Sequence, residues 1–445
     1  MSAAAVTQVF RPALESCGFR KGIIRTRYEF VDFGANGMPT RIATLAAFGC
    51  KPHDFRTACI AIVAMSSRGP VGPSDVGEFR ALGAPYVFVV TGGQVELWGI
   101  RGTKPPEKKH ELPLEEVPAF LSQHGETFSP TRIVEAKNPF ADRAKQLDFV
   151  DAGLLPALNH EVGQKLHELV ERLMTEAVVC HKEAQGASPD FPELFRLVFR
   201  MLTGKILSDK GVRIEFADPR GVLSAVRDYY NTPVFCLPVV SEKQTQQLVF
   251  EAIRDSIRFH NLTPESVAHV YENTLVTKET REQYGTHSTP SYIADYIAWR
   301  LPLDDISLDA LHVFEPAIGC AALLTSVLRR IRLLLPIDWS AHRKHRYFVE
   351  HLSGFDVDPF AVETALLSLT LADFPNKDGW RIEQGDLWRT DALERGASQA
   401  TVLLATPPFQ NFSPKERASL RADGHGPAMA NKTTEMLGRC LSHLP

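Results

Sequence analysis

The chain has 445 residues, of which 44% are hydrophobic and 23% are charged. This composition is typical of a folded globular protein and excludes a disordered or fibrous chain, while the length predicts two or three domains. The sequence has neither a signal peptide nor an apolar run long enough to span a bilayer, so we expect a cytoplasmic protein without membrane contact.

The net charge of -4 gives no general attraction for nucleic acid. A DNA-binding surface therefore requires basic side chains gathered on one face, or a domain supplied by another chain. The seven cysteines are scattered and never spaced as Cys-x-x-Cys, which excludes a disulfide framework and a zinc ribbon. We predict no metal site.

Residues 1–138 predict a small α/β domain. Apolar runs at 57–65 and 85–100 are typical of buried strands, and the pair Gly92-Gly93 divides the second run into a hairpin. Residues 139–262 predict a helical connector, because apolar residues recur three and four positions apart. The helices expected there cover 162–183, 191–210, 221–230 and 242–261. We assign no chemistry to this connector.

The third predicted domain covers 263–445 and begins with a helix over 264–277. The run Tyr-Gly-Thr-His-Ser-Thr-Pro at 284–290 follows, and its proline opens another helix. Next comes Val-Phe-Glu-Pro-Ala-Ile-Gly-Cys-Ala-Ala-Leu-Leu at 313–324, a strand, a turn of small residues and a helix start. Such a turn brings backbone N–H groups and a helix N-terminus to one point, where a nucleoside or a charged tail can bind.

Three further stretches follow in order. Gly-Phe-Asp-Val-Asp-Pro at 354–359 ends a second strand in Asp356, where an acid can accept both ribose hydroxyls, with Asp358 as the alternative. Gly-Asp at 385–386 ends a third strand. The apolar run 401–405 is typical of a central parallel strand and leads into Thr-Pro-Pro-Phe. The basic run at 342–346 predicts a solvated loop, with contact to phosphate as the alternative.

The order of these stretches resembles that of S-adenosylmethionine-dependent DNA methyltransferases that act on exocyclic amino groups, in the gamma arrangement found in type I and type IIG restriction-modification enzymes. The resemblance covers the chain from about residue 270 to its end. It implies a Rossmann-like methyltransferase domain, S-adenosylmethionine as cofactor, double-stranded DNA as partner and the N6 amino group of adenine as target.

The resemblance also implies roles for single residues. The Thr-Pro pair folds over the methionine part of the cofactor, Glu315 lies near its ammonium group, Asp356 binds the ribose and Asp386 contacts the adenine amino group. The cofactor-binding positions are Thr289, Pro290, Glu315, Pro316, Ala317, Gly319, Asp356 and Asp386. The catalytic positions are Thr406, Pro407, Pro408 and Phe409.

The Thr-Pro-Pro-Phe stretch fits this chemistry for a physical reason. An exocyclic amine is a poor nucleophile, because its lone pair is delocalised into the ring. Two acceptors, the side chain of Thr406 and the carbonyl after it, can take both amine hydrogens and turn the lone pair toward the methyl group. The aromatic ring of Phe409 stacks on a base flipped out of the duplex.

Three positions depart from the family pattern. Ala321 replaces a glycine, and its methyl group crowds the turn or disfavours a positive φ. Ile318 replaces a small or polar residue, and Thr406 replaces Asn, Asp or Ser with a shorter hydroxyl. These departures predict a weakened pocket. They leave open a catalytically silent DNA-binding subunit of a defence system as the alternative, and a methyltransferase for RNA or a protein side chain as another.

The strand, turn and strand of residues 85–100 resemble the nuclease-like domain that precedes methyltransferase modules in type I and type IIG systems. Such a nuclease needs an acid, and then an acid-x-Lys on the next strand, to hold a divalent ion. Asp54 can be the first acid, but the following strand carries no charge, and Glu-Ala-Lys at 135–137 comes late in the domain. We therefore expect a degenerate nuclease-like domain.

The family's sheet has seven strands, and a further strand is expected beside 401–405. Neither that strand nor a target-recognition domain follows in this sequence. We expect a methyltransferase domain that is incomplete at its C-terminus, from a truncated or split gene, with a downstream polypeptide supplying the rest. An apolar strand left at a sheet edge would otherwise promote aggregation.

Overall fold

The computed structural model describes residues 2–66, 70–102, 104–138, 153–275, 289–377 and 379–445. The chain divides into two compact units. The first comprises residues 1–165, 209–212 and 256–263, and the second comprises 166–208, 213–255 and 264–445. Among the described residues, no helix combines the length and the apolar character that crossing a membrane requires.

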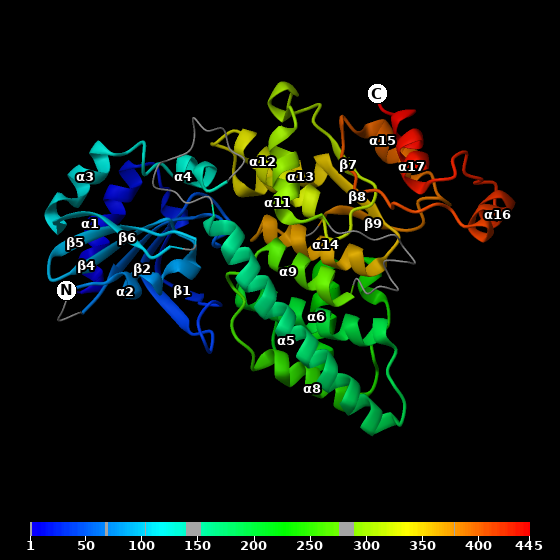
Figure 1. Ribbon diagram of the computed structural model, residues 1–445, viewed down its shortest axis with the longest axis horizontal. Coiled ribbons are helices and arrows are strands. Elements are labelled where there is room, and N and C mark those ends of the chain that lie inside the picture. Colours follow the sequence, from blue (N-terminus) through cyan, green and yellow to red (C-terminus); the bar gives the residue numbers. More distant parts are fainter. Residues whose placement is uncertain (1, 67–69, 103, 139–152, 276–288, 378) are drawn as a thin grey trace. The chain divides into compact units, whose positions relative to one another are not determined.

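The first unit contains a six-stranded sheet in the order β1-β2-β3-β4-β5-β6 (Figure 1). The strands are β1 (Ile24–Val31), β2 (Thr40–Phe48), β3 (Ala58–Ala64), β4 (Tyr86–Thr91), β5 (Gln94–Gly99) and β6 (Glu107–Pro113). The helices are α1 (Ala3–Ser16), α2 (Pro73–Gly77), α3 (Val117–Gln123) and α4 (Pro130–Ala136). Short 3-10 turns lie at Lys21–Ile23, Arg80–Leu82 and Leu114–Glu116.

The centre of this sheet explains the two apolar runs in the sequence. Strands β3 and β4 pair in parallel with Ile60 opposite Tyr86, and nearly all their side chains are buried. A strand with neighbours on both sides and cover on both faces needs apolar residues throughout. The hairpin between β4 and β5 turns at Gly92 and Gly93, with φ of 56° and 97°, a conformation that glycine adopts without strain. The predicted strands and hairpin are confirmed.

The second unit begins with a group of helices. They are α5 (Leu154–Gln185, of which the part from 166 belongs here), α6 (Phe191–Asp209), α7 (Pro219–Tyr230) and α8 (Lys243–Arg254), with a 3-10 turn at Pro233–Cys236. Three of the four predicted connector helices are confirmed. The fourth, expected over 242–261, ends earlier, at Arg254. The reason is tertiary: the backbone N–H of Phe259 donates to the Asp209 carboxylate at 2.7 Å instead of to a helical carbonyl.

The second unit also contains a parallel sheet in the order β10-β7-β8-β9 (Figure 1). Its strands are β7 (Val313–Glu315), β8 (Leu352–Asp356), β9 (Arg381–Gln384) and β10 (Val402–Leu403). Its helices are α9 (Pro264–Val270), a π-helical turn (Tyr271–Leu275), α11 (Ser291–Arg300), a 3-10 turn (Leu303–Asp305), α12 (Ala322–Leu334), α13 (Ala341–His351), α14 (Pro359–Ala372), α15 (Ala392–Gln399), α16 (Pro414–Ala422) and α17 (Lys432–Leu441). Strands therefore alternate with helices, which confirms a mixed α/β unit.

The two faces of this sheet are covered by different helices. Phe314 and Phe355 belong to an apolar cluster with buried residues of α15 and α17. Because successive side chains of a strand point to opposite faces, Glu315 points away from that cluster, and it meets the backbone of α12. The start of α12 is thus held directly over the end of β7.

Two predictions for this unit need correction. The basic run at 342–346, expected as a solvated loop, lies in helix α13. The Ser340 hydroxyl caps that helix by accepting from the N–H of Arg343 at 3.2 Å, and the Arg343 guanidinium lies 4.0 Å from the centre of the Trp339 ring. The helix expected over 264–277 ends at Val270 and continues as the π-helical turn. Residues 276–288, which include most of the predicted run before Thr289, lie outside the described residues.

Candidate functional site

Three of the predicted site residues lie at one edge of the parallel sheet. Glu315 ends β7, Asp356 ends β8, and Thr406 follows β10 by three residues. Phe314 pairs with Ser353 on one side and with Leu403 on the other, so the three strands end at similar heights. Crevices beyond the carboxyl ends of parallel strands are where α/β folds bind ligands.

The turn between β7 and α12 is fixed to the end of β8. The N–H of Ile318 donates to the carbonyl of Phe355 at 3.0 Å, and the N–H of Gly319 donates to the carboxylate of Asp356 at 2.9 Å. Gly319 has φ of 53°, and a methyl group added there would meet no atom of the described residues within 4 Å. The space over Gly319 is therefore open, as a ligand that approaches the backbone requires.

Ile318 is accommodated inside the fold. A methyl group on Gly354 would lie 2.5 Å from the end of the Ile318 side chain, so glycine at 354 makes room for it. Ala321 is fully buried and takes a left-handed conformation, with φ of 62° and ψ of 33°. The alanine thus adopts the backbone that glycine favours, at a cost of about 1–2 kcal/mol. The positive φ that a side chain disfavours is therefore present at Ala321.

The carboxylates of this edge are held by backbone donors. Glu315 is only 2% exposed, and its Oε2 accepts from the N–H of Leu324 at 3.1 Å. Burial raises the pKa of Glu315 well above its usual value. Asp356 accepts from Gly319 with one oxygen and from the N–H of Asp358 with the other, at 3.0 Å. Burial raises the pKa of Asp356 to about 6.

Asp358 completes this group. Its Oδ1 accepts from the N–H of Phe360 at 2.9 Å and so caps α14, while its Oδ2 accepts from the Tyr271 hydroxyl at 3.3 Å. Burial raises the pKa of Asp358 as well. Within the described residues, none of the carboxylates of Glu315, Asp356 and Asp358 forms an ion pair with a basic side chain. The edge therefore gathers three acidic groups whose pKa values are raised by burial, and a positively charged ligand bound there would favour their ionised forms.

Asp386 lies near the same edge, because the N–H of Gly385 donates to the backbone carbonyl of Asp356 at 2.9 Å. Its side chain already has partners. One oxygen accepts from the N–H of Trp388 at 2.8 Å, and the other lies 3.3 Å from the Nε of Arg389. A contact from Asp386 to an adenine amino group would have to share the carboxylate with Arg389.

The loop at 406–409 is held from two sides. The hydroxyls of Thr289 and Thr406 lie 2.6 Å apart, so the two predicted stretches that carry them meet. From the other side, the Thr433 hydroxyl of α17 donates to the carbonyl of Pro408 at 2.9 Å. Phe409 remains 58% exposed. An exposed ring beside a fixed polar group is what stacking on an extruded base requires.

The sequence did not indicate Tyr271 or Thr433 as part of this region. Both act through single hydroxyl contacts to residues far away in the chain, and neither stands in a motif. The structure gives Pro290 the cap position of α11, and Pro316 and Ala317 lie in the turn after β7. Pro407 lies directly between the two held residues of the loop.

The predicted nuclease residues of the first unit have structural partners. Asp54 accepts from the N–H groups of Arg56 and Thr57 at 2.9 and 3.1 Å. The ammonium group of Lys137 donates to the carbonyls of Phe55 and Ala58 at 2.6 and 2.8 Å, and burial lowers the pKa of Lys137 to about 7. Across the part of the chain that is described, no group of three His, Cys, Asp or Glu residues is placed to hold a metal ion. Both residues stabilise one loop here.

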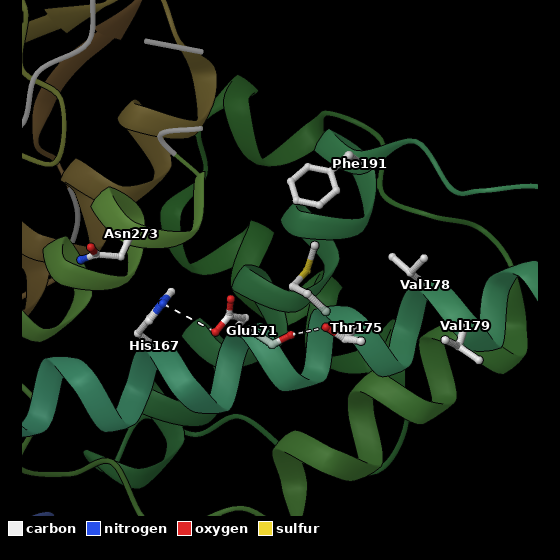
Figure 2. Close-up of a pocket in the computed structure, with 8 residues that line it drawn as sticks. His167, Glu171, Thr175, Val178, Val179, Phe191 and Asn273 are labelled. Carbon is white, nitrogen blue, oxygen red and sulfur yellow. Dashed lines mark hydrogen bonds and ion pairs between the residues drawn. The ribbon is translucent and has the colours of Figure 1, made fainter. Parts of the chain in front are cut away.

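A separate pocket of about 360 Å³ lies on the connector helices (Figure 2). Its polar end holds His167 and Glu171, whose Nε2 and Oε2 atoms are 3.8 Å apart. The lining residues are His167, Glu171, Met174, Thr175, Val178, Val179, Phe191 and Asn273. None of the predicted site residues lines it, and the candidate site at the sheet edge is therefore distinct.

No protein-family profile and no curated protein matches the chain. Similar solved structures include a DrdV–DNA complex, with 14% identity over 94% of this chain and 42% of that chain and a TM-score of 0.38. Another is a modification subunit of a putative type I restriction enzyme from Vibrio vulnificus YJ016, with 12% identity over 62% and 67% of the two chains and a TM-score of 0.42.

A third similar structure is the type IIG restriction endonuclease BpuSI, with 12% identity over 97% of this chain and 49% of that chain and a TM-score of 0.40. The chain thus spans less than half the length of the DrdV and BpuSI chains. All three TM-scores are below 0.5, so the function is inferred from the residues of this chain.

Proposed function

We propose that this chain binds S-adenosylmethionine at the edge formed by β7, β8 and β10 and transfers its methyl group to an amino group of DNA. The observation that carries the proposal is the group of three carboxylates, Glu315, Asp356 and Asp358, around an open glycine turn and without an ion pair to a basic side chain of the described residues. A cofactor with an ammonium and a sulfonium group would favour the ionised forms of these acids.

Asp356 and Glu315 would bind different parts of the cofactor. Asp356 is already oriented by Gly319 and Asp358, and each of its oxygens keeps a lone pair for a ribose hydroxyl. Glu315 lies deeper and is fixed by Leu324, where it can orient the ammonium group. Bound there, S-adenosylmethionine would supply an electrophilic methyl group.

The loop after β10 would hold the acceptor of that methyl group. Thr406 offers a hydroxyl oxygen to an amine hydrogen, and Phe409 offers an exposed ring on which the flipped base can stack. The target that fits the order of the stretches is the N6 amino group of adenine, in a restriction-modification or related defence system. The order of the sequence stretches leads us to propose the gamma class of amino-group DNA methyltransferases.

Strand β10 pairs only with β7 among the described strands, and its other edge can accept a further strand. A downstream polypeptide that adds this strand and a target-recognition domain would complete the sheet and give base specificity. The opposite edge, at β9, is less apolar and has exposed side chains.

A second candidate function has a specific observation in its favour. The Thr406 hydroxyl already has a partner in Thr289, and Asp386 is paired with Arg389. Both groups would have to serve a substrate or cofactor while keeping these contacts. A DNA-binding subunit without turnover would not use the Thr406 hydroxyl or the Asp386 carboxylate for a substrate or cofactor. The experiment must distinguish this alternative from methyl transfer.

The test is calorimetric titration of the purified chain with S-adenosylmethionine, repeated with Asp356→Ala and with the polypeptide encoded immediately downstream. We expect binding that Asp356→Ala abolishes. Transfer of a labelled methyl group to unmethylated duplex DNA then follows, and mass spectrometry of the nucleosides distinguishes N6-methyladenine from N4-methylcytosine. Absence of cofactor binding in both preparations would overturn the proposal, and binding without transfer would favour the silent subunit.

A further inference from the structure

We propose that Thr289 is a positioning residue that makes the Thr406 hydroxyl a hydrogen-bond acceptor for the target amine. The inference rests on the proposed methyl transfer, since it concerns how the target amino group is held. It gives Thr289 a function toward the acceptor of the methyl group, in addition to the expected contact with the cofactor.

The geometry fixes the two hydroxyls against each other. Their oxygens lie 2.6 Å apart in a partly buried position. Thr406 is anchored through β10, where the N–H of Leu404 donates to the carbonyl of Phe314 at 2.9 Å. Thr289 is anchored through the next residue, because the carbonyl of Pro290 accepts from the N–H groups at the start of α11. The backbone next to each threonine is therefore held by hydrogen bonds, which keeps the two hydroxyls in contact.

Only one hydrogen can lie between the two oxygens, so one threonine donates and the other accepts. An amino group brings two hydrogens to the site and needs acceptors there. If Thr406 donates to Thr289, both remaining lone pairs of the Thr406 oxygen can face the amine, and the donated hydrogen bond makes that oxygen a stronger acceptor. In the opposite arrangement, the hydrogen of Thr406 would point at the amine hydrogens.

This arrangement explains how a threonine can stand where a group with only acceptor character is needed. A hydroxyl by itself is both donor and acceptor, and it would bind a carbonyl oxygen as readily as an amine. With its hydrogen held by Thr289, Thr406 distinguishes an amino group from a carbonyl group. Hypoxanthine carries an oxo group in place of the 6-amino group of adenine, together with a hydrogen on N1, and it provides a probe of this discrimination.

The first test compares Thr289→Val, which keeps the shape and loses the hydroxyl, with Thr289→Ser, which keeps the hydroxyl. Methyl transfer to unmethylated duplex DNA of random sequence is measured, with kcat and KM determined separately. We expect Thr289→Val to lower kcat by about 10- to 100-fold, the effect of a misplaced reacting group, and Thr289→Ser to keep most of the activity. Calorimetry with S-adenosylmethionine gives the cofactor affinity independently, and a loss of affinity that accounts for the whole effect would overturn the proposal.

The second test uses Thr406→Asn. An amide carbonyl has no hydrogen to be held, so Thr289→Val is expected to cost little activity in the Thr406→Asn background. An equal loss in both backgrounds would contradict the positioning role. Binding competition between adenine duplexes and hypoxanthine duplexes adds a readout without turnover. The preference for adenine is expected in the parent chain and should weaken in Thr289→Val, and an unchanged preference would contradict the proposal.

The hydrogen bond itself is tested without DNA or cofactor. Thermal unfolding of Thr289→Val, Thr406→Val and the double variant forms a cycle in which the two shifts in Tm should not add. Additive shifts would show that the contact is absent and would overturn the inference. A chain that shows the coupling but neither binds S-adenosylmethionine nor methylates DNA would instead overturn the proposed function, and the positioning role would fall with it.

Discussion

Thr289 and Thr406 are 117 positions apart in the sequence and share a hydrogen bond of 2.6 Å between their hydroxyl oxygens. The contact joins the residue two positions ahead of α11 to the loop that follows β10. The stretch expected over the methionine part of the cofactor and the stretch expected at the target base are therefore in direct contact. Substitutions on either side should have linked effects on transfer.

Phe409→Ala is expected to weaken methyl transfer to DNA and to leave the fold and the cofactor site unchanged. The ring is 58% exposed, so its removal opens no large cavity in the core. Stacking of a base on an aromatic side chain contributes about 1–3 kcal/mol. That corresponds to a loss of about 5- to 150-fold in kcat/KM. Steady-state transfer assays and calorimetry with S-adenosylmethionine measure the two effects separately.

Phe191→Ala is the matched control for this experiment. Phe191 is 45% exposed on α6 and lines the pocket of the connector (Figure 2). Its truncation removes the same group at a similar exposure, and we expect transfer to remain at the parental rate. Similar losses of kcat/KM in both variants would mean that Phe409 has no special part in holding the base.

The affinity for S-adenosylmethionine is expected to rise as the pH increases through about 6. Burial raises the pKa of Asp356 to about 6, and only the ionised carboxylate can accept both ribose hydroxyls. Below that pH the group carries a proton that binding must displace. For folding without ligand the same raised pKa acts in the opposite direction, because the folded chain holds the proton more tightly, so this contribution to stability is lost as the pH rises through about 6.

Calorimetric titrations of the parent chain and of Asp356→Asn between about pH 5 and about pH 8 test this prediction. The variant should bind weakly at every pH and lose the pH dependence. Asp391→Asn is the control, since Asp391 lies at the surface in an ion pair with Arg395. If Asp356→Asn retained the parental pH dependence, the titrating group would have to be another one, such as Asp358.

The sequence was sufficient to predict the arrangement of the candidate site along the sheet. Apolar runs identified the central strands, and a polar residue directly after an apolar run marks a strand end. Since parallel strands end at the same edge, Glu315, Asp356 and Thr406 could be expected together from their positions alone. The pattern of apolar and polar residues along each segment carries this information, and that pattern is a local property of the sequence.

The partners of individual side chains could not be predicted in the same way. Nothing near Tyr271 in the sequence indicates that its hydroxyl reaches Asp358, and nothing near Thr433 indicates the carbonyl of Pro408. These contacts depend on how helices pack over long sequence separations. The end of α8 at Arg254 has the same origin, since the helical pattern continues while a distant carboxylate, Asp209, takes the backbone hydrogen bond.

Ala321→Gly is expected to stabilise the chain. The left-handed backbone at Ala321 costs about 1–2 kcal/mol for a residue with a side chain, and glycine removes this strain. The greater freedom of glycine in the unfolded chain takes back about 0.4–1 kcal/mol. The net gain in the free energy of unfolding should therefore lie between about 0 and about 1.6 kcal/mol, measured by urea denaturation.

Ala365→Gly provides the contrast for that experiment, because Ala365 is fully buried in the interior of α14. Glycine at an ordinary helical position destabilises by about 1 kcal/mol. Opposite signs for the two variants would identify the backbone of Ala321 as strained. Destabilisation by Ala321→Gly as large as that by Ala365→Gly would show that the buried methyl group contributes more than the strain removes.

The last prediction concerns the attachment of α6 to α14. The Arg200 guanidinium contacts Glu363 through two hydrogen bonds, of 3.1 and 2.5 Å, and the two side chains are 5% and 0% exposed. Arg200 also donates to the carbonyls of Val234 and Leu237. Glu363→Leu would leave a buried cation with no carboxylate partner, and we expect a loss of about 3–5 kcal/mol in the free energy of unfolding.

Urea denaturation of Glu363→Leu and of the control Glu176→Leu measures this difference. Glu176 is exposed on α5, and its substitution should change the free energy of unfolding by no more than about 0.5 kcal/mol. Since α14 begins directly after Asp358, loss of the Arg200 pair should also loosen the candidate site. Equal stabilities of the two variants would mean that the Coulomb attraction within the pair only balances its desolvation cost, and that α14 is held by its apolar contacts instead.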